Sequence, residues 1–332
     1  MLTDDKRRRL REGMVIPAHP LALHEDRTLD PRRQRALTRH YLDCGAGGVA
    51  VGVHTTQFEI RDHGLYEPVL RLAAEEAGPD PILVAGVLGP TPSALTEARI
   101  AADLGYDLAL VATPGWGTAP DEEILEGVAR IAETLPVFGF YIQPALGKRR
   151  FSYDFWRQYA QIPGVEAIKI APFDRYATLD VIRAVADTGH AEDIALYTGN
   201  DDNIIVDLLT PYRVNDTTLH IVGGLLGQWA IWTRAAVALH TEARTIARTG
   251  APIPADLLTR AAELTDANAA AFDAANTFAG SIAGINEILT RDGLLAGNWC
   301  LSEHERLSAG QAGEIDRVIA AYPGVVGGVV GG

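Results

Sequence analysis

Short apolar segments recur along the chain, and stretches with helical spacing separate them. Segments such as VAVGV, ILVAG, LALVA, VFGFYI and AIKIA are apolar at nearly every position, as parallel strands covered by helices are. The pattern predicts eight strands that start near Met14, Gly48, Pro81, Leu108, Val137, Glu166, Ile194 and Leu219. Steps of 25 to 34 residues between these starts fit one strand, one helix and two loops per unit. The expected fold is therefore α/β, a (β/α)8 TIM barrel.

Capping residues mark the ends of several expected helices. Thr91 followed by Pro92 is typical of an N-cap with proline at the first helical position, and Gly105 ends the same helix. Asp174 is expected to cap the helix after the sixth strand. Asp201 or Asp202 is expected to cap the helix after the seventh strand.

The C-terminal quarter of the chain is expected to add helices to the barrel. A helix from about Gln228 to Arg248 would close a barrel of residues 1–250, and residues 251–332 would form a helical extension packed on it. Further helices are expected near 255–264, 267–291 and 302–321, followed by a loose tail, GGVVGG. No linker rich in Pro, Gly or Ser indicates a separate second domain.

Composition narrows the class of protein. The chain carries 29 Lys and Arg against 43 Asp and Glu, a formal charge of −14, which argues against nucleic acid as a partner. A hydrophobic content of 47% suits a large folded core. No secretory signal and no apolar run of about 18 residues is evident, so we expect a cytoplasmic protein without a membrane partner. Cys44 and Cys300 do not form a disulfide framework.

Two common kinds of site are disfavoured. The segment GAGGVA, residues 45–50, matches a dinucleotide fingerprint by letter, but it ends an expected helix and leads into a strand, the reverse of the required order. The nine histidines show no compact metal-ligand spacing. A metal-dependent barrel enzyme is therefore the less favoured reading.

Lys169 stands out as a candidate for chemistry. The chain has only three lysines, and Lys169 alone lies in an apolar strand, VEAIKIAPF. Burial disfavours the charged form and lowers the pKa of such an amine, so that its neutral form can attack a carbonyl carbon to give an imine. The alternative is a structural lysine in a buried pair with a glutamate.

Residues at the ends of neighbouring strands could serve such a lysine. Tyr141 ends the preceding strand, VFGFYI, and its phenol is expected near the Lys169 amine at the C-terminal mouth of the barrel. Thr55 and Thr56, in VGVHTTQF, offer hydroxyl and backbone N–H groups to a carboxylate.

Several segments, in order and spacing, resemble the dihydrodipicolinate synthase / N-acetylneuraminate lyase family of class I, Schiff-base aldolases, over roughly residues 10–240. VGVHTT resembles the family's Gly-Thr-Thr-Gly-Glu loop, GFYIQPA its Tyr-Asn-x-Pro segment, VEAIKIAPFD its imine-lysine strand and TGNDD its Ser-Gly-Asp-Asp turn. The resemblance implies an imine between Lys169 and a 2-oxo acid such as pyruvate, with Tyr141 as the proton relay. It also implies a homo-oligomer, a dimer or tetramer, with no metal or organic cofactor. The substrate-binding residues expected are Thr55, Thr56, His54, Trp116, Gly199 and Gly223.

The chain also departs from the family pattern. Gln57 and Phe58 replace the Gly-Glu after the two threonines, and Thr113-Pro114-Gly115-Trp116 replaces Pro-Pro-Tyr-Tyr, which removes a relay tyrosine. Leu146 stands where the synthase has an arginine, which argues against an aspartate-semialdehyde-like substrate and so against a true dihydrodipicolinate synthase. Trp116, with Phe140 and Trp229, either forms an apolar mouth that suits an aryl or otherwise apolar aldehyde or simply fills the rim of the barrel.

Two functional hypotheses follow. The first is an enzyme, a carbon-carbon or carbon-oxygen lyase that acts on a 2-oxo acid, as an aldolase or a dehydratase. The second is a catalytically weakened barrel of the same family that binds a keto acid as a binding or regulatory protein.

Overall fold

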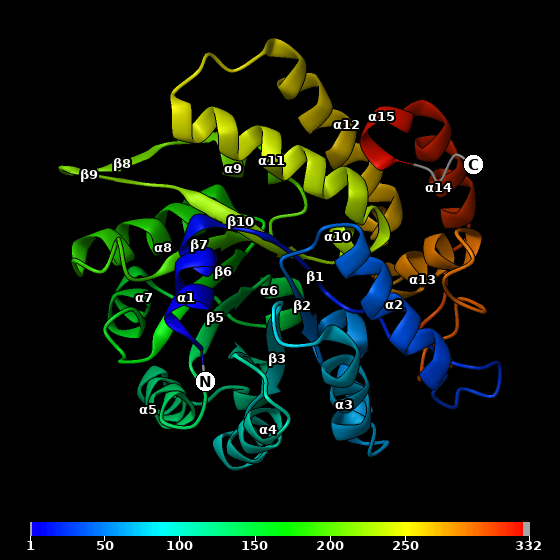
Figure 1. The fold of residues 1–332 in the computed structure, drawn as a ribbon, viewed down its shortest axis with the longest axis horizontal. Coiled ribbons are helices and arrows are strands. Elements are labelled where there is room, and N and C mark those ends of the chain that lie inside the picture. The colour runs from blue at the N-terminus through cyan, green and yellow to red at the C-terminus, as the bar shows by residue number, and fades with distance from the viewer. Residues whose placement is uncertain (1, 328–332) are drawn as a thin grey trace.

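Eight parallel strands form a closed barrel at the centre of the molecule (Figure 1). The structure is a computed structural model and describes residues 2–327. The barrel strands are β1 (Val15–Pro17), β2 (Gly48–Val51), β3 (Ile82–Leu88), β4 (Leu108–Ala112), β5 (Val137–Ile142), β6 (Val165–Ala171), β7 (Ala195–Thr198) and β10 (Ile221–Leu226). Their order is β1-β10-β7-β6-β5-β4-β3-β2, and a parallel bridge between Ala18 and Ala50 joins the two ends. The predicted (β/α)8 barrel is confirmed, and each strand starts within two residues of its expected position.

Helices surround the barrel and cover the outer faces of its strands (Figure 1). These are α2 (Pro31–Asp43), α3 (Tyr66–Ala77), α4 (Thr91–Asp103), α5 (Asp121–Ala132), α7 (Tyr153–Tyr159), α8 (Arg175–Asp187), α9 (Ile204–Leu209) and α11 (Thr233–Thr249). The short helix α6 (Pro144–Gly147) lies instead over the carboxyl end of the barrel (Figure 1), where its Leu146 lines the cavity described below. Helix α1 (Asp4–Glu12) precedes β1 and places Leu10 in the apolar cluster inside the barrel. Short 3-10 turns lie at His54–Thr56, Phe58–Arg61, Pro114–Trp116 and Ala274–Asn276.

The segment before the last barrel strand differs from expectation. An antiparallel hairpin, β8 (Tyr212–Val214) and β9 (Thr217–Leu219), projects from the barrel beside α8 (Figure 1). The expected eighth strand therefore begins two residues later, at Ile221.

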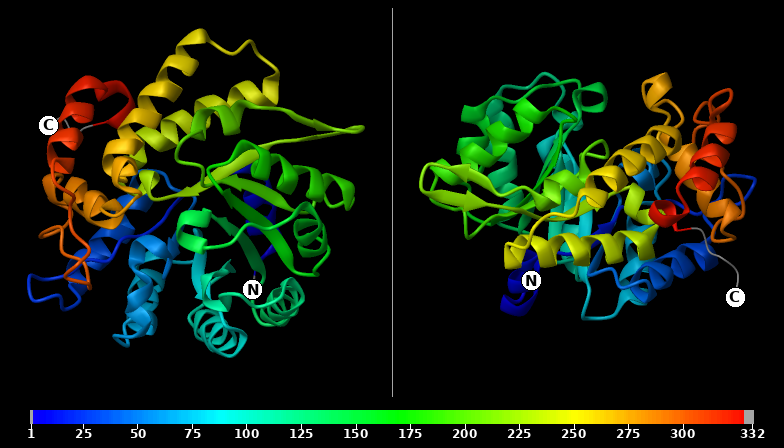
Figure 2. Two further views of the ribbon diagram at one scale, coloured as in Figure 1. Left: turned by 180° about the vertical axis from the view of Figure 1, so that it is seen from behind. Right: turned by 90° about the horizontal axis from the view of Figure 1, so that it is seen from above.

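The C-terminal helices gather on one side of the barrel (Figure 2). They are α10 (Gln228–Ile231), α12 (Ala255–Ala271), α13 (Ser281–Arg291), α14 (Gln311–Ala321) and α15 (Pro323–Val326). Three expectations for this region were wrong. Trp232 separates α10 from α11, residues 272–280 interrupt the helix expected over 267–291, and the last expected helix starts at Gln311 rather than near 302. Apart from Gly327, the glycine-rich tail lies outside the described residues.

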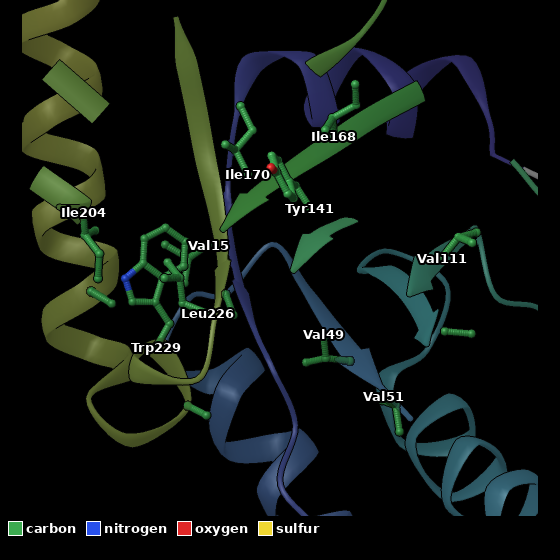
Figure 3. Close-up of a cluster of buried hydrophobic side chains, with 14 of the residues drawn as sticks. Val15, Val49, Val51, Val111, Tyr141, Ile168, Ile170, Ile204, Leu226 and Trp229 are labelled. Atoms are coloured by element: carbon green, nitrogen blue, oxygen red, sulfur yellow. The ribbon is translucent and has the colours of Figure 1, made fainter. Parts of the chain in front are cut away.

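Apolar side chains form two clusters, one inside the barrel and one between the barrel strands and the surrounding helices. Phe138, Phe140 and Ile142 of β5 belong to the inner cluster, whereas the alternate residue Tyr141 belongs to the outer one. Figure 3 shows part of the outer cluster, with Ile168, Ile170 and Tyr141 together. Since successive side chains of a strand point to opposite faces, Lys169 lies on the inner face.

The capping predictions had mixed outcomes. Asp174 caps α8, as predicted, because its Oδ1 accepts from the N–H groups of Tyr176 and Ala177 at 2.9 and 3.2 Å. The prediction for Thr91 was wrong, since α4 already begins at this residue and its hydroxyl accepts from Trp116 Nε1 at 3.2 Å instead. None of the helices in residues 2–327 is long and apolar enough to cross a membrane.

Candidate active site

Lys169 lies inside the barrel near the carboxyl end of β6. It is in register with Phe140 of β5 and Tyr197 of β7. The residue is 9% exposed, and its Nζ lies 4.2 Å from the centroid of the Phe140 ring, over the ring face. Burial lowers the pKa of the Lys169 amine, and the negative charge of Asp201 opposes this shift. A hydrogen-bonded carboxylate partner is not found among the described residues, which weighs against a structural Lys–Glu pair.

The Lys169 side chain lines a cavity at the carboxyl ends of the strands. Active sites of (β/α)8 barrels are built at this end. The loops after β2, β5, β6 and β7 contribute to its wall, and so do α13 and the segment between α12 and α13. The lining residues used below are His54, Thr55, Phe140, Ile142, Gln143, Leu146, Lys169, Phe173, Gly199, Asp201, Phe272, Phe278, Ser281 and Ile285.

Asp201 is the acidic residue of this cavity. Its Oδ1 is buried without a hydrogen-bond partner, while its backbone carbonyl accepts from Asn268 Nδ2 at 2.7 Å. Burial raises the pKa of the Asp201 carboxyl, and the positive charge of Lys169 opposes this shift. The expected capping role for Asp201 or Asp202 was wrong, because α9 starts at Ile204, directly after Asn203. Sequence reasoning thus missed Asp201 as a site residue although the motif TGNDD contains it.

A buried carboxylate fixes the loop that carries Asp201. Asp207 of α9 is fully buried and accepts from Thr198 Oγ1 at 2.7 Å and from Asn200 Nδ2 at 3.0 Å. Arg175 Nη1 donates to the same carboxylate at 2.8 Å. These bonds tie the residues on both sides of Gly199 to α9, so the turn leading to Asp201 is held in place.

The turn after β2 brings His54 and Thr55 to the cavity, but not Thr56. Burial, together with the nearby charge of Lys169, lowers the pKa of His54 to about 4, so its imidazole is neutral at pH 7. Thr55 Oγ1 donates to the Ala18 carbonyl at 2.8 Å. Thr56 is fully buried, and its hydroxyl donates to the His19 carbonyl at 2.6 Å and accepts from Gly52 N–H at 3.0 Å. These bonds give Thr56 a role in shaping the turn.

The structure does not bring Tyr141 to Lys169. Tyr141 is in register with Ile170 and shares its outward direction (Figure 3). Its ring packs against Trp156 at a centroid distance of 5.1 Å, and its hydroxyl accepts from the Phe151 N–H at 3.3 Å. The prediction that the Tyr141 phenol lies near the Lys169 amine was therefore wrong, because the alternation of side chains along β5 places Phe140 on the inner face instead.

Of the remaining expected residues, Gly199 lies in the cavity wall, and Trp116 and Gly223 do not. A Cβ on Gly199 would lie 2.5 Å from Lys169 Cε, so this glycine makes room for the lysine side chain. Trp116 packs between Gly89 and Gly127 on the outside of the barrel. Gly223 lies deeper in the barrel, where a Cβ would meet the Tyr197 ring at 2.6 Å. Of the three aromatic residues expected at the mouth, only Phe140 lines the cavity, since Trp229 also belongs to the outer cluster (Figure 3).

The donor set of the cavity suits proton transfer and carbonyl chemistry. Within residues 2–327, no group of three or more His, Cys, Asp or Glu side chains is arranged to hold a metal ion. The amine of Lys169, the unpartnered carboxyl of Asp201 and the neutral imidazole of His54 line one cavity. Such an arrangement can form an imine and move the protons that its formation requires.

Comparison with known proteins gives a family, relatives and a matching fold. The model of the dihydrodipicolinate synthetase family matches residues 12–224. A probable 5-dehydro-4-deoxyglucarate dehydratase 2 of Streptomyces coelicolor is 31% identical over 178 residues, 52% of this chain and 53% of that protein. An N-acetylneuraminate lyase of Citrobacter koseri is 29% identical over 199 residues, 59% of this chain and 65% of that protein. The matches thus span between half and two thirds of these relatives.

A solved structure extends the likeness in fold to nearly the whole chain. The chloride-inhibited dihydrodipicolinate synthase of Acinetobacter baumannii, crystallised with pyruvate, superposes with a TM-score of 0.74 at 19% identity. The superposition covers 93% of this chain and 98% of that chain.

Proposed function

This chain belongs to the dihydrodipicolinate synthetase family, and on that premise we propose that it is a lyase that binds a 2-oxo acid such as pyruvate as an imine on Lys169. The observation that carries the proposal is the buried Lys169 amine, which opens into the cavity without a hydrogen-bonded carboxylate. A lowered pKa makes the neutral, nucleophilic amine accessible near pH 7. The names of the relatives, a lyase and a dehydratase, and the pyruvate bound to the solved synthase support the same chemistry.

Imine formation requires proton transfers that the site can supply. The neutral Lys169 amine adds to the carbonyl carbon of the 2-oxo acid, and its proton moves to the carbonyl oxygen. A second proton on that hydroxyl lets water leave, and a protonated imine remains. Asp201 is placed to give the second proton, because its pKa is raised and its Oδ1 has no other partner. After the step, the Asp201 carboxylate faces the positive charge of the imine.

The carboxylate of the 2-oxo acid needs donors beside Lys169. The turn His54–Thr56 opens with backbone N–H groups, and the first N–H groups of a helical turn have no partner within it. His54 and Thr55 of this turn line the cavity. We assign this turn to the carboxylate, with Thr56 holding its shape from below through bonds to His19 and Gly52.

The imine can then react in two ways. Loss of a proton from the carbon next to the imine gives an enamine. The enamine either adds to an aldehyde or, in a longer 2-oxo acid with a hydroxyl group on the following carbon, expels that group, which takes up a proton and leaves as water. The first course makes the enzyme an aldolase, and the second a dehydratase.

One observation favours a second candidate function, a keto-acid-binding protein with little turnover. The phenol of Tyr141 lies outside the barrel, so the tyrosine that the family pattern assigns to proton relay does not reach Lys169. The two functions differ in turnover and share the imine.

Trapping with borohydride tests the imine. The protein is incubated with pyruvate and sodium borohydride, and its intact mass is measured. We expect a mass increase of one reduced pyruvyl group, lost in Lys169→Ala and retained in Lys148→Ala, whose exposed amine bonds only the Ala145 carbonyl. An unchanged mass with pyruvate and other 2-oxo acids would refute the imine. Turnover of pyruvate with aldehydes then separates an enzyme from a binding protein.

A further inference from the structure

The cavity beyond Lys169 has an apolar wall drawn from three segments. Leu146 lies after β5, Phe173 after β6, and Phe272, Phe278 and Ile285 belong to the C-terminal helical region. The rings of Phe173 and Phe278 meet edge to face, with centroids 5.6 Å apart. Gln143 and Ser281 are the neutral polar side chains that lie among them.

Both phenylalanines are held in a backbone conformation that L-residues rarely adopt. The φ angle is 54° at Phe173 and 66° at Phe278. Such conformations persist where the surrounding structure enforces them, and they concentrate at binding sites. Phe173 N–H donates to Asn200 Oδ1 at 3.1 Å, and Phe278 N–H donates to the Asp273 carbonyl at 3.0 Å. A hydrogen bond of its own thus holds the backbone at each of the two phenylalanines.

Buried polar groups fix the segment that carries Phe278. Asp273 is 4% exposed, and its carboxylate accepts from Gly280 N–H at 3.0 Å and from Ser308 Oγ at 2.5 Å. Gln311 of α14 donates to the Gly280 carbonyl at 3.1 Å. The segment between α12 and α13 is therefore a fixed wall of the cavity.

The charges around the cavity disfavour an anionic second substrate. Lys169 is the single Lys or Arg among the described residues that line it, and its amine is committed to the imine. Glu59 and Glu305 line an adjoining pocket that shares His54, Ile142 and Leu146 with the cavity. Burial, with the charge of Glu59, raises the pKa of Glu305 to about 7.

From this wall we infer that the site takes a neutral aldehyde with an aromatic or hydrocarbon side chain, and that Phe278 and Phe173 select it. The inference rests on the proposed function, since the aldehyde is the partner of the enamine on Lys169. A polyhydroxylated aldehyde would lose hydrogen bonds to water on entry, and the wall offers few replacements. An aromatic ring would pack against both phenylalanines without that loss.

Two aldehydes of equal heavy-atom count, benzaldehyde and erythrose, test the inference with pyruvate as co-substrate. We expect a kcat/KM for benzaldehyde at least about 100-fold above that for erythrose, a ratio that one apolar pocket can supply. Phe278→Asn should reduce this ratio about tenfold or more, because asparagine tolerates positive φ and removes the ring. Thr277→Asn is the matched control, since Thr277 has a φ of 55°, is exposed and does not line the cavity.

The outcomes separate this inference from the proposed function. Equal or better turnover of erythrose, or a ratio unchanged in Phe278→Asn, overturns the inference. Pyruvate trapping in the same variant reports the imine independently and should stay at the wild-type level. Saturation-transfer NMR detects contact of benzaldehyde or erythrose with the protein and does not depend on a chemical reaction. Preferential benzaldehyde contact that is lost in Phe278→Asn supports the inference even if trapping fails, and the absence of this preference refutes it.

Discussion

Replacing Asp201 by asparagine removes the proposed proton donor while it preserves the shape of the side chain. The carboxyl Oδ1 is buried without a partner, so an amide can occupy the same space without breaking a side-chain hydrogen bond. A positioned general acid typically accelerates a step by about 10²–10⁴-fold. We therefore expect Asp201→Asn to slow formation of the borohydride-trappable adduct by about 10²–10⁴-fold at pH 7.

The pH dependence of the rate of adduct formation tests the role of Asp201 more specifically. Asp201 raises the pKa of Lys169 through its negative charge, so Asp201→Asn lowers the Lys169 pKa further and increases the neutral amine at a given pH. In the wild type, the reactive state needs a neutral Lys169 and a protonated Asp201, which gives a bell-shaped profile with two apparent pKa values of the pair. The falling limb, which reports loss of the Asp201 proton, should disappear in Asp201→Asn. His54, with a pKa of about 4, should add no limb near pH 6.5.

The assay follows adduct mass against time from pH 5 to pH 10, with borohydride quenching at each time point. Asp202→Asn is the matched control, because Asp202 is exposed, lies 3.6 Å from Arg175 Nη2 and does not line the cavity with Lys169. A bell-shaped profile retained in Asp201→Asn, or a rate within about threefold of the wild type, would refute Asp201 as the donor.

Two further substitutions test how the barrel accommodates Lys169. Gly199→Ala would place a Cβ 2.5 Å from Lys169 Cε and 2.7 Å from Ala171 Cβ, so the lysine must move. We expect about 10²-fold slower trapping and a loss of about 1–3 kcal/mol in the free energy of unfolding, measured with urea. The control is Gly313→Ala in α14, whose Cβ meets nothing within 4 Å: trapping should be unchanged, and the free energy of unfolding should not fall, since alanine favours a helix more than glycine does. Lys169→Met should raise the free energy of unfolding at pH 7 by on the order of 1–3 kcal/mol, because the folded protein disfavours the buried ammonium. The gain in the free energy of unfolding should be full below the lowered pKa of Lys169. It should shrink as the pH rises from there toward 10.5, where the lysine of the unfolded protein also loses its charge. A lower free energy of unfolding for Lys169→Met at pH 7 would contradict this reasoning.

The barrel could be predicted from the sequence because its signal repeats. Eight apolar segments at regular spacing define eight units, and the strands begin where those segments begin. The hairpin β8–β9 was missed because its two strands have three residues each and its sequence, YRVNDTTL, carries mixed polar residues. The break at 272–280 was missed because Asp273 and Gln311 enforce it through contacts distant in the sequence.

The direction of strand side chains could not be predicted at β5. All six residues of VFGFYI are buried, so no alternation of polar and apolar residues shows which side chains point into the barrel. The register between β5 and β6 determines the direction of these side chains and places Phe140, rather than Tyr141, beside Lys169. Lys169 itself was identifiable because a charged residue in an apolar strand is costly and rare.

Asp201 illustrates a different limit. The segment TGNDDN offers five Thr, Asn or Asp residues that can cap a helix, and local sequence does not distinguish a cap from a cavity residue. Its position depends on Asp207 and Asn268, which hold the loop from α9 and α12. The proposed proton donor thus lies in a motif that local rules assign to helix termini.

The residues of the proposed imine chemistry and most of the proposed selective wall come from different parts of the chain, although Leu146 and Phe173 of the wall lie within the family-matched region. Lys169, Asp201 and the His54–Thr56 turn lie within residues 12–224, which the family model matches. Phe272, Phe278 and Ile285 lie beyond residue 224, in the region where the chain must close the cavity. Under the proposed function, such a protein can keep the imine while its second substrate changes, because the proposed selection depends on contacts that the imine does not use. The names of relatives matched over part of their length therefore inform the chemistry at Lys169, and the C-terminal wall informs the substrate.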